Sequence, residues 1–401
     1  MARPSIGIWL VGARGGVATT TMVGLAALQR KTISTMGLVS ELPDFTHLPL
    51  PSWDSFVVGG HDIRTTPLIE TAEAFTRNDQ AIRSEIVQAV RRDLARMDKN
   101  IRPGTLINVG DTIEQLADGR LKRKNEKPRA AIERIQSDLK EFVRKNKLQH
   151  LVVVNVASTE PQVDERNLPR KWADLDKLLD QPRKCPLGAS SIYAIAALDL
   201  GYPYVNFTPS LGSKPKAICE LATQRDTCHM GHDGKTGETL LKSVLAPMFA
   251  QRNLEVMSWV GHNIFGNLDS QVLGTPENKQ TKVVSKDRLL GQILGYSPQT
   301  HVSIEYIESL GDWKTAWDHI HFRGFLGTPM KLQFTWQGCD SLLAAPLVLD
   351  LIRFSHCAHQ RGDRGLLKFL ACFFKSPIGV KENDFGRQFQ MLIDWSRAGA
   401  K

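Results

Sequence analysis

A glycine-rich turn near the start of the chain constrains the fold more than any other feature. The run IGIWLV at Ile6–Val11 is continuously apolar, as expected of a parallel strand that is buried on both faces. The segment Gly12–Gly16 follows as a turn, and Val17–Gln29 then carries apolar residues at helical spacing. A second strand is predicted at Ser34–Val39, which completes a strand–helix–strand unit. The sequence therefore predicts an α/β fold with a doubly wound parallel sheet of the Rossmann type.

The same turn is suited to a dinucleotide, because backbone N–H groups and the N-terminus of the following helix attract a pyrophosphate. The pattern departs from GxGxxG, since Arg14 replaces the second glycine and Ala18 the third. A tight turn without a ligand is the alternative, and the Arg14 guanidinium is a candidate partner of a phosphate. The residues expected to contact a cofactor here are Gly12, Ala13, Arg14, Gly15, Gly16, Val17 and Thr19.

Later segments offer further cofactor contacts. An acid after the second strand would bond ribose hydroxyls; Glu41 is the candidate by position and Asp62 the second, although either could bond backbone in a loop. Strands predicted at His150–Val156 and Tyr204–Phe207 end in polar loops, where ligands lie in an open parallel sheet, with ordinary turn chemistry as the alternative. These loops and the segment HDGKTGE add Asn155, Ala157, Ser158, Thr159, Asn206, Thr208, Pro209, Ser210 and Asp233.

Composition indicates a soluble globular protein with room for two domains, or for one domain with an insertion. The 401 residues are 42% hydrophobic and 23% charged, with a formal net charge of +9. Because the basic residues are scattered and no recognition motif accompanies them, we expect an anionic substrate and no nucleic acid.

The apolar stretches Leu342–Ile352 and Leu366–Phe374 are too short or too interrupted to cross a bilayer, so we expect no membrane partner. Six dispersed cysteines without CxxC indicate reduced thiols and a cytoplasmic location.

The sequence pattern changes from about Gly234. The following segments predict strands of a more mixed, antiparallel sheet: Met257–Ile264, Gln280–Val284, His301–Ile307 and Met330–Trp336. A long apolar helix is predicted at Ser341–His356, and Pro346 inside it implies a kink or a helix start near that point.

Four lysines, Lys282, Lys286, Lys314 and Lys375, suggest a site that binds phosphate or moves protons, although most lysines are solvated surface residues. Lys375 follows two phenylalanines, so we expect burial to lower the pKa of its ammonium and to suit it to proton transfer. Lys282 and Lys286 would share one face on a helix or on a strand, and could therefore converge on one anion. Two acids, Asp269 and Asp340, could balance this charge or hold a cation.

In their order along the chain, these segments resemble the inositol-3-phosphate synthase (myo-inositol-1-phosphate synthase) family, especially its short archaeal-like form. The resemblance covers nearly the whole chain and rests on VGARGGVATT, GGHDIR, NVASTEP, HDGKTGET, SKDRLLGQILGYSP, GDWKTAWD and CFFKSP. It implies an NAD-binding Rossmann-type domain, residues 1–233 and 340–401. An α+β tetramerisation and catalytic domain, residues 234–339, would interrupt it, and the protein would be a homotetramer.

The resemblance also implies a reaction. NAD would oxidise C5 of open-chain glucose 6-phosphate, which permits enolisation at C6 and an aldol closure between C6 and C1. Reduction of the ketone by the retained NADH would then give 1D-myo-inositol 3-phosphate. Two alternatives are another NAD-dependent dehydrogenase of a phosphorylated substrate and a non-catalytic nucleotide-binding scaffold.

The family motifs assign the catalytic positions. By resemblance these are Lys282, Lys286, Lys314, Lys375, Asp233, Asp269 and Asp340. Lys282 would exchange a proton at the C5 oxygen, and Lys375 would polarise the C1 aldehyde. The other two lysines would supply positive charge to the phosphate and to a developing alkoxide. A divalent metal ion, or a monovalent cation such as potassium or ammonium, is a further expected cofactor. Which of these assists stays open, since Asp233, Asp269 and Asp340 suit either kind.

Overall fold

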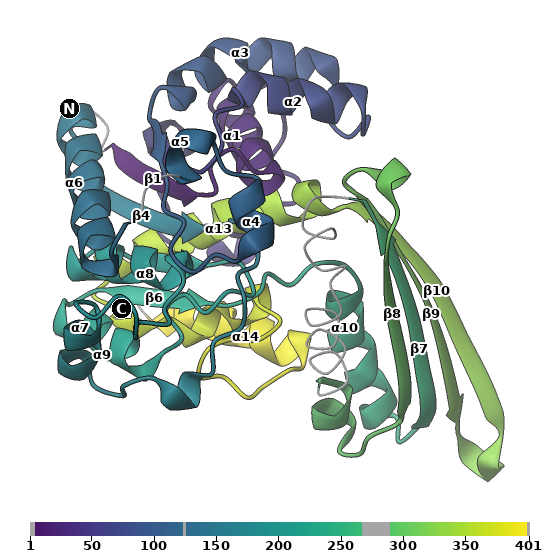
Figure 1. Ribbon diagram of the computed structural model, residues 1–401. Helices are drawn as coiled ribbons and strands as arrows, with labels where there is room; N and C mark the ends of the chain where they lie inside the picture. The colour runs from purple at the N-terminus through teal and green to yellow at the C-terminus, as the bar shows by residue number, and fades with distance from the viewer. Residues whose placement is uncertain (1–4, 123–125, 267–288, 399–401) are drawn as a thin grey trace.

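The computed structural model describes residues 5–122, 126–266 and 289–398, which form two sheets and their covering helices (Figure 1). The larger sheet has seven parallel strands in the order β11-β6-β5-β4-β1-β2-β3. Its strands are β1 (Ile6–Val11), β2 (Phe56–Asp62), β3 (Ile101–Pro103), β4 (His150–Asn155), β5 (Tyr204–Asn206), β6 (Cys228–Gly231) and β11 (Gly365–Leu366). The order from β3 to β6 is that of a doubly wound dinucleotide-binding sheet, so the predicted fold class is confirmed.

Alternate side chains of the central strand β1 enter two separate hydrophobic cores. Ile6, Ile8 and Leu10 pack with α1 (Gly16–Gln29), α3 (Ser84–Asp98) and α13 (Asp340–Gln360). Trp9 and Val11 pack on the other face with α6 (Pro128–Asn146) and α8 (Ala189–Asp199). Side chains of a strand alternate between faces, so a strand covered by helices on both sides must be apolar throughout. This requirement explains the continuous apolar run in the sequence.

The other helices are shorter or lie at the periphery. They are α2 (Leu68–Arg77), α4 (Asp111–Gln115), α5 (Gly119–Lys122), α7 (Trp172–Leu178), α9 (Lys216–Gln224), α10 (Gly237–Gln251) and α14 (Phe385–Ala398). Short 3₁₀ turns lie at Val39–Glu41, Pro43–Phe45, Trp53–Ser55, Glu165–Asn167, Glu308–Leu310, Phe325–Gly327 and Lys368–Phe373. By length and composition α13 could cross a membrane, but 72% of its apolar window is buried inside the protein. It is therefore explained as a core helix of the first sheet.

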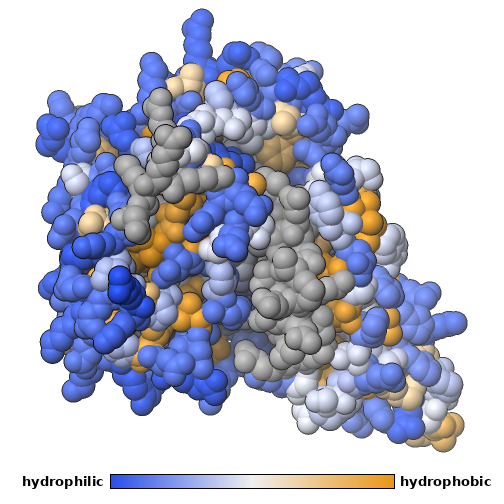
Figure 2. Space-filling view, viewed as in Figure 1, coloured by the Kyte–Doolittle hydropathy of each residue, from blue (hydrophilic) through white to orange (hydrophobic). Residues whose placement is uncertain are grey.

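The second sheet has four strands in the order β10-β9-β7-β8. Its strands are β7 (Glu255–Phe265), β8 (Gln299–Tyr306), β9 (Trp313–Arg323) and β10 (Pro329–Cys339). The β7–β8 pair is parallel and the other two pairs are antiparallel. Phe249 of α10 and Trp259 of β7 are fully buried between helix and sheet, whereas Trp317 on the opposite face is 45% exposed. Figure 2 also shows apolar residues at the far end of this sheet, where Phe325 and Leu326 lie at the β9–β10 turn.

One predicted strand is absent, and five strands of the described residues were not predicted: β2, β3, β6, β9 and β11. Ser34–Val39 is not a strand: the segment is largely exposed, and a strand beside β1 has to be buried on both faces. The neighbour of β1 is instead β2, where Gly59 allows the Phe142 ring to approach. Strand β9 was missed because its polar and apolar side chains do not alternate regularly: Asp318 is buried, whereas Trp317 is 45% exposed. The strand predicted at Gln280–Val284 lies outside the described residues.

The C-terminal part of the chain returns to the first sheet. Helix α13 packs in the hydrophobic core on one face of that sheet. Strand β11, which follows the second sheet in the sequence, pairs with β6 (Figure 1). Pro346 lies inside α13, which begins six residues earlier at Asp340 and not at the proline. The proposed domain boundaries near 233 and 340 remain predictions.

Candidate active site

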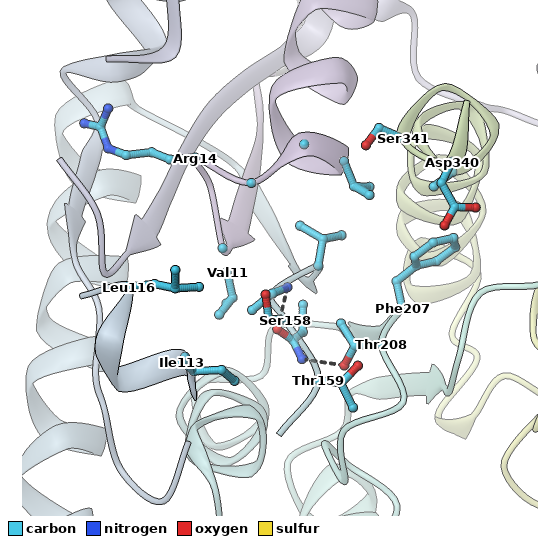
Figure 3. Close-up of a pocket in the computed structure, with 18 of the residues that line it drawn as sticks. Val11, Arg14, Ile113, Leu116, Ser158, Thr159, Phe207, Thr208, Asp340 and Ser341 are labelled. Carbon is cyan, nitrogen blue, oxygen red and sulfur yellow. Dashed lines mark hydrogen bonds between the residues drawn. The ribbon is translucent and has the colours of Figure 1, made fainter. Parts of the chain in front are cut away.

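A cavity of about 680 Å³ lies at the carboxyl ends of the parallel strands (Figure 3). Its walls include the glycine turn after β1, the loops after β2, β4 and β5, and the start of α13. Strand β1 lies between β2 and β4, so the cavity occupies the point where the chain reverses its direction of winding. Ligands of doubly wound sheets bind at this point.

The glycine turn has the shape of a phosphate cradle. Gly12 has φ +83°, and a Cβ there would lie 2.6 Å from the Cα of Ala157, so both its backbone conformation and its surroundings require glycine. The backbone N–H groups of Gly12 and Ala13 donate to the carbonyl of His61, at 2.9 and 3.0 Å. Helix α1 begins at Gly16 without a side-chain cap, and Gly15 and Gly16 both line the cavity. The first turn of α1 is therefore suited to hold a pyrophosphate.

Asp62 is the acid that the second strand presents to the cavity. It is the last residue of β2, and its carboxylate accepts hydrogen bonds from the backbone N–H groups of Arg14, at 2.6 Å, and Arg64, at 2.8 Å. Glu41 does not line the cavity and forms a 2.6 Å ion pair with Arg353. Glu41 was expected to follow a strand at Ser34–Val39 and so to lie at the carboxyl edge of the sheet. Because that strand is absent, Glu41 is not placed at this edge. Of the two candidates for the ribose, the structure brings only Asp62 to the cavity.

The remaining cofactor candidates divide into cavity-lining residues and residues behind them. Those that line the cavity are Gly12, Arg14, Gly15, Gly16, Val17, Asn155, Ala157, Ser158, Thr159, Thr208, Pro209 and Asp233. Those that do not are Ala13, Thr19, Asn206 and Ser210. Asn155 donates to Asn206 at 3.1 Å and to Thr208 at 3.2 Å, so the amides hold the two loops together. The Arg14 guanidinium bonds the carbonyl of Thr66 and lies 2.7 Å from Asp98, on the side away from Asp340 (Figure 3).

Lys375 and Asp233 form an ion pair at the cavity, with 2.9 Å between Nζ and Oδ1. The two chain segments are paired by their backbones: Lys375 donates to the carbonyl of Asp233 at 2.7 Å, and Lys235 to that of Phe373 at 2.8 Å. Burial has the largest single effect and lowers the pKa of the Lys375 ammonium, but the charge and hydrogen bond of Asp233, together with the charges of Asp340 and Glu238, outweigh it, and the pKa is raised. The predicted lowering of this pKa was therefore wrong, because the sequence did not reveal the carboxylate partner.

Two further predicted groups reach the same cavity. Lys314, on β9, has its ammonium 4.9 Å from the ring centroid of Phe265. Asp340 lies in the first turn of α13 (Figure 3). The structure thus brings together Lys314, Lys375, Asp233 and Asp340, while Lys282, Lys286 and Asp269 lie outside the described residues. No group of three or more His, Cys, Asp or Glu side chains within 5–122, 126–266 and 289–398 is placed to hold a metal.

Sequence reasoning missed two buried acids in the cavity wall. Asp312 accepts from the backbone N–H of Ser341 at 2.7 Å and from its hydroxyl at 3.0 Å, which fixes the first turn of α13. Glu160 accepts from the backbone N–H and the hydroxyl of Ser190. Each stands in a segment that carries other candidates, Asp312 two residues before Lys314 and Glu160 directly after Thr159. That proximity was the only signal available.

The fold and the cavity define a dinucleotide-binding protein of the Rossmann type with a charged second site beside the cofactor crevice. The residues present fit NAD: a glycine cradle, an uncapped helix N-terminus, the Asp62 carboxylate, and an apolar wall that includes Ile113 and Leu116.

Comparisons with known proteins specify the family. The family model described as Myo-inositol-1-phosphate synthase matches residues 6–397. The chain is 30% identical to inositol-3-phosphate synthase 1 of Bacteroides thetaiotaomicron, over 96% of this chain and 94% of that protein. It is 27% identical to inositol-3-phosphate synthase 1 of Oryza sativa subsp. japonica, over 87% of this chain and 74% of that one. The chain therefore belongs to the myo-inositol-1-phosphate synthase family.

Solved structures agree on the fold. The crystal structure of inositol-3-phosphate synthase from Caenorhabditis elegans matches with a TM-score of 0.85 and 22% identity, over 99% of this chain and 86% of that chain. A myo-inositol-1-phosphate synthase-related protein from Thermotoga maritima matches with a TM-score of 0.78 and 24% identity, over 98% of both chains.

Proposed function

We propose that this chain is an NAD-dependent inositol-3-phosphate synthase, an isomerase that converts D-glucose 6-phosphate to 1D-myo-inositol 3-phosphate. The observation that carries the proposal is the placement of the Lys375–Asp233 pair in the same cavity as the glycine turn. The match to the family over residues 6–397 supports it, because both halves of this site fall within the matched length.

The turn after β1 and Asp62 would hold the cofactor, whose nicotinamide ring would supply the hydride chemistry of the reaction when bound. Lys375 stays protonated beside Asp233, so its ammonium can donate a hydrogen bond to a carbonyl oxygen of the substrate that becomes an alkoxide. Lys314 adds a second positive charge in the same cavity, suited to the phosphate or to the developing alkoxide. Asp340 can accept a hydrogen bond from a substrate hydroxyl.

We include Lys282, Lys286 and Asp269 as catalytic residues in this proposal, and only the family motifs support their roles. An assisting divalent or monovalent cation is part of it as well, with Asp233, Asp269 and Asp340 as candidate ligands. We further propose a homotetramer in the cytoplasm, without nucleic-acid or membrane partners. The open face of the second sheet supports self-association, because Trp317 is 45% exposed there and Phe325 and Leu326 are 88% and 86% exposed at the sheet's end.

The decisive experiment is to incubate the pure protein with glucose 6-phosphate and a catalytic amount of NAD, and to identify the product by NMR. A cyclitol phosphate formed in excess over the cofactor is the expected result. Accumulation of NADH with an oxidised sugar phosphate would instead indicate a simple dehydrogenase. Binding of NAD without any product, across cations and pH values, would favour a non-catalytic nucleotide-binding protein.

A further inference from the structure

Glu160 is a buried acid in the wall of the cavity that the proposed reaction does not use. It follows Thr159 in the loop after β4 and is 9% exposed. Its Oε1 accepts from the backbone N–H of Ser190 and its Oε2 from the Ser190 hydroxyl, both at 2.6 Å. Among the residues that the structure describes, no basic side chain forms an ion pair with it. Burial raises the pKa of its carboxyl to about 7, and the two bonds from Ser190 oppose that rise.

The contacts of Glu160 join three segments that border the cavity. Its backbone N–H donates to the Ser210 hydroxyl at 3.0 Å, in the loop after β5. The Ser190 hydroxyl in turn accepts from the backbone N–H of Gly212 at 3.1 Å. One residue therefore connects the loop after β4, the start of α8 and the loop after β5.

The space around this connection is tight at both ends of the loop. A Cβ on Gly188, the residue before α8, would lie 2.5 Å from Oε2 of Glu160. At the other end, Ala157 lies against Gly12 of the glycine turn, where a Cβ would be 2.6 Å from the Cα of Ala157. The segment 157–160 is thus held between α8 and the cofactor cradle. All four of its residues line the cavity, so the segment forms part of the cavity wall.

We propose that Glu160 is a positioning residue for NAD, which acts by fixing the loop after β4 and not by chemistry on the substrate. The inference rests on the proposed function, because it places NAD in this cavity. Truncation of Glu160 removes two hydrogen bonds and leaves both buried Ser190 donors without their acceptor. Loss of these contacts lets the loop move, so the dinucleotide has to order it again on binding.

The test measures NAD affinity by isothermal titration calorimetry, together with kcat and the KM for NAD, at a pH above the pKa of Glu160. Glu160→Ala is expected to weaken NAD binding about tenfold or more, and to raise KM while kcat at saturating NAD changes less than about threefold. Glu160→Gln can accept from the Ser190 N–H and donate to its hydroxyl, so it should restore affinity to within about threefold. Ser190→Ala removes two hydrogen bonds, the one that its hydroxyl donates to Glu160 and the one that it accepts from the backbone N–H of Gly212, with a smaller change in side-chain volume, and should weaken NAD binding about threefold.

Glu220→Ala is the matched control. The Glu220 carboxylate accepts from the backbone N–H of Trp172 at 2.6 Å, at the start of α7, and Glu220 does not line the cavity. This variant should lose thermal stability and keep the wild-type affinity for NAD. Unchanged NAD affinity in both Glu160→Ala and Ser190→Ala would overturn the inference and leave the proposed function standing. A wild-type protein that binds no NAD would overturn the proposed function itself.

Discussion

The Lys375 ammonium lies 2.9 Å from the Asp233 carboxylate, although 142 positions separate the two residues in the sequence. The pairing of the loop after β6 with the segment after the 3₁₀ turn at Lys368–Phe373 brings them together. The side chain of Lys375 is 23% exposed and that of Asp233 19%, so solvent screens the pair only in part. Removing either partner therefore has a separate and predictable effect.

Lys375→Met should abolish turnover and leave NAD binding intact. The substitution keeps the length of the side chain and removes the charge that is proposed to stabilise the alkoxide. We expect kcat to fall by about 10²-fold or more, with the NAD affinity within about twofold of wild type. Product formation followed by NMR and NAD binding by calorimetry check the two parts. The exposed Lys381→Met is the matched control and should keep full activity; turnover by Lys375→Met at more than half the wild-type rate would contradict the assignment.

Asp233→Asn should move the alkaline limit of activity to lower pH. In the wild type burial lowers the pKa of Lys375, but Asp233 together with Asp340 and Glu238 outweighs burial and raises it, so the ammonium stays charged through neutral pH and above. Without the carboxylate, burial is the dominant effect and lowers that pKa. In a profile of kcat/KM against pH, the alkaline limb of Asp233→Asn should lie at a lower pH than that of the wild type. An alkaline limb at the wild-type position in Asp233→Asn would show that the activity does not depend on this ammonium.

Gly12→Ala should weaken NAD binding more than it destabilises the fold. A Cβ at Gly12 meets the backbone of Ala157, and the residue also has a positive φ. Gly37 has φ +88°, and no atom lies within 4 Å of the place a Cβ would take there, so Gly37→Ala isolates the cost of backbone strain. Both variants should lose about 1 kcal/mol or more of unfolding free energy in denaturant titrations. Only Gly12→Ala should also lose affinity for NAD, and equal affinities in the two variants would count against the cradle.

The sequence was sufficient where a local pattern reports burial or a backbone conformation. Ile6–Val11 and the turn at Gly12 were predicted because a strand buried on both faces and a positive φ each demand particular residue types. The second strand was misplaced because the choice of the segment that pairs with β1 depends on distant contacts. In β2 that contact is the close approach of the Phe142 ring to Gly59, and Phe142 is distant in the sequence. The sequence likewise did not reveal that Asp233 is the ion-pair partner of Lys375, or that Glu160 accepts hydrogen bonds from Ser190. Such contacts are set by topology, and no spacing rule within one segment reveals them.

The protein should lose stability below about pH 6.5 through a chain of three histidines far from the cavity. His150 Nδ1 lies 2.9 Å from Nδ1 of His356, and its Nε2 lies 3.1 Å from Nδ1 of His359. Burial lowers the pKa of His150 to about 3 and that of His356 to about 4, and the pKa of His359 is lowered as well. The unfolded chain therefore binds more protons, so this stability is present above the unfolded pKa and is lost as the pH falls toward the folded values. His150 and His356 should each cost about 2 kcal/mol between pH 7 and pH 5.

Substitution of one member of the chain separates this effect from other acid-induced changes. In His356→Gln the difference in unfolding free energy between pH 7 and pH 5 should be smaller than in wild type by about 2 kcal/mol. His262→Gln, at an exposed position on the open sheet, serves as the control and should follow the wild-type curve. Urea titrations at the two pH values supply the numbers. Parallel curves for wild type and His356→Gln would mean that His356 is already charged at pH 7 or stays neutral in the unfolded chain, and the burial argument for this cluster would then be wrong.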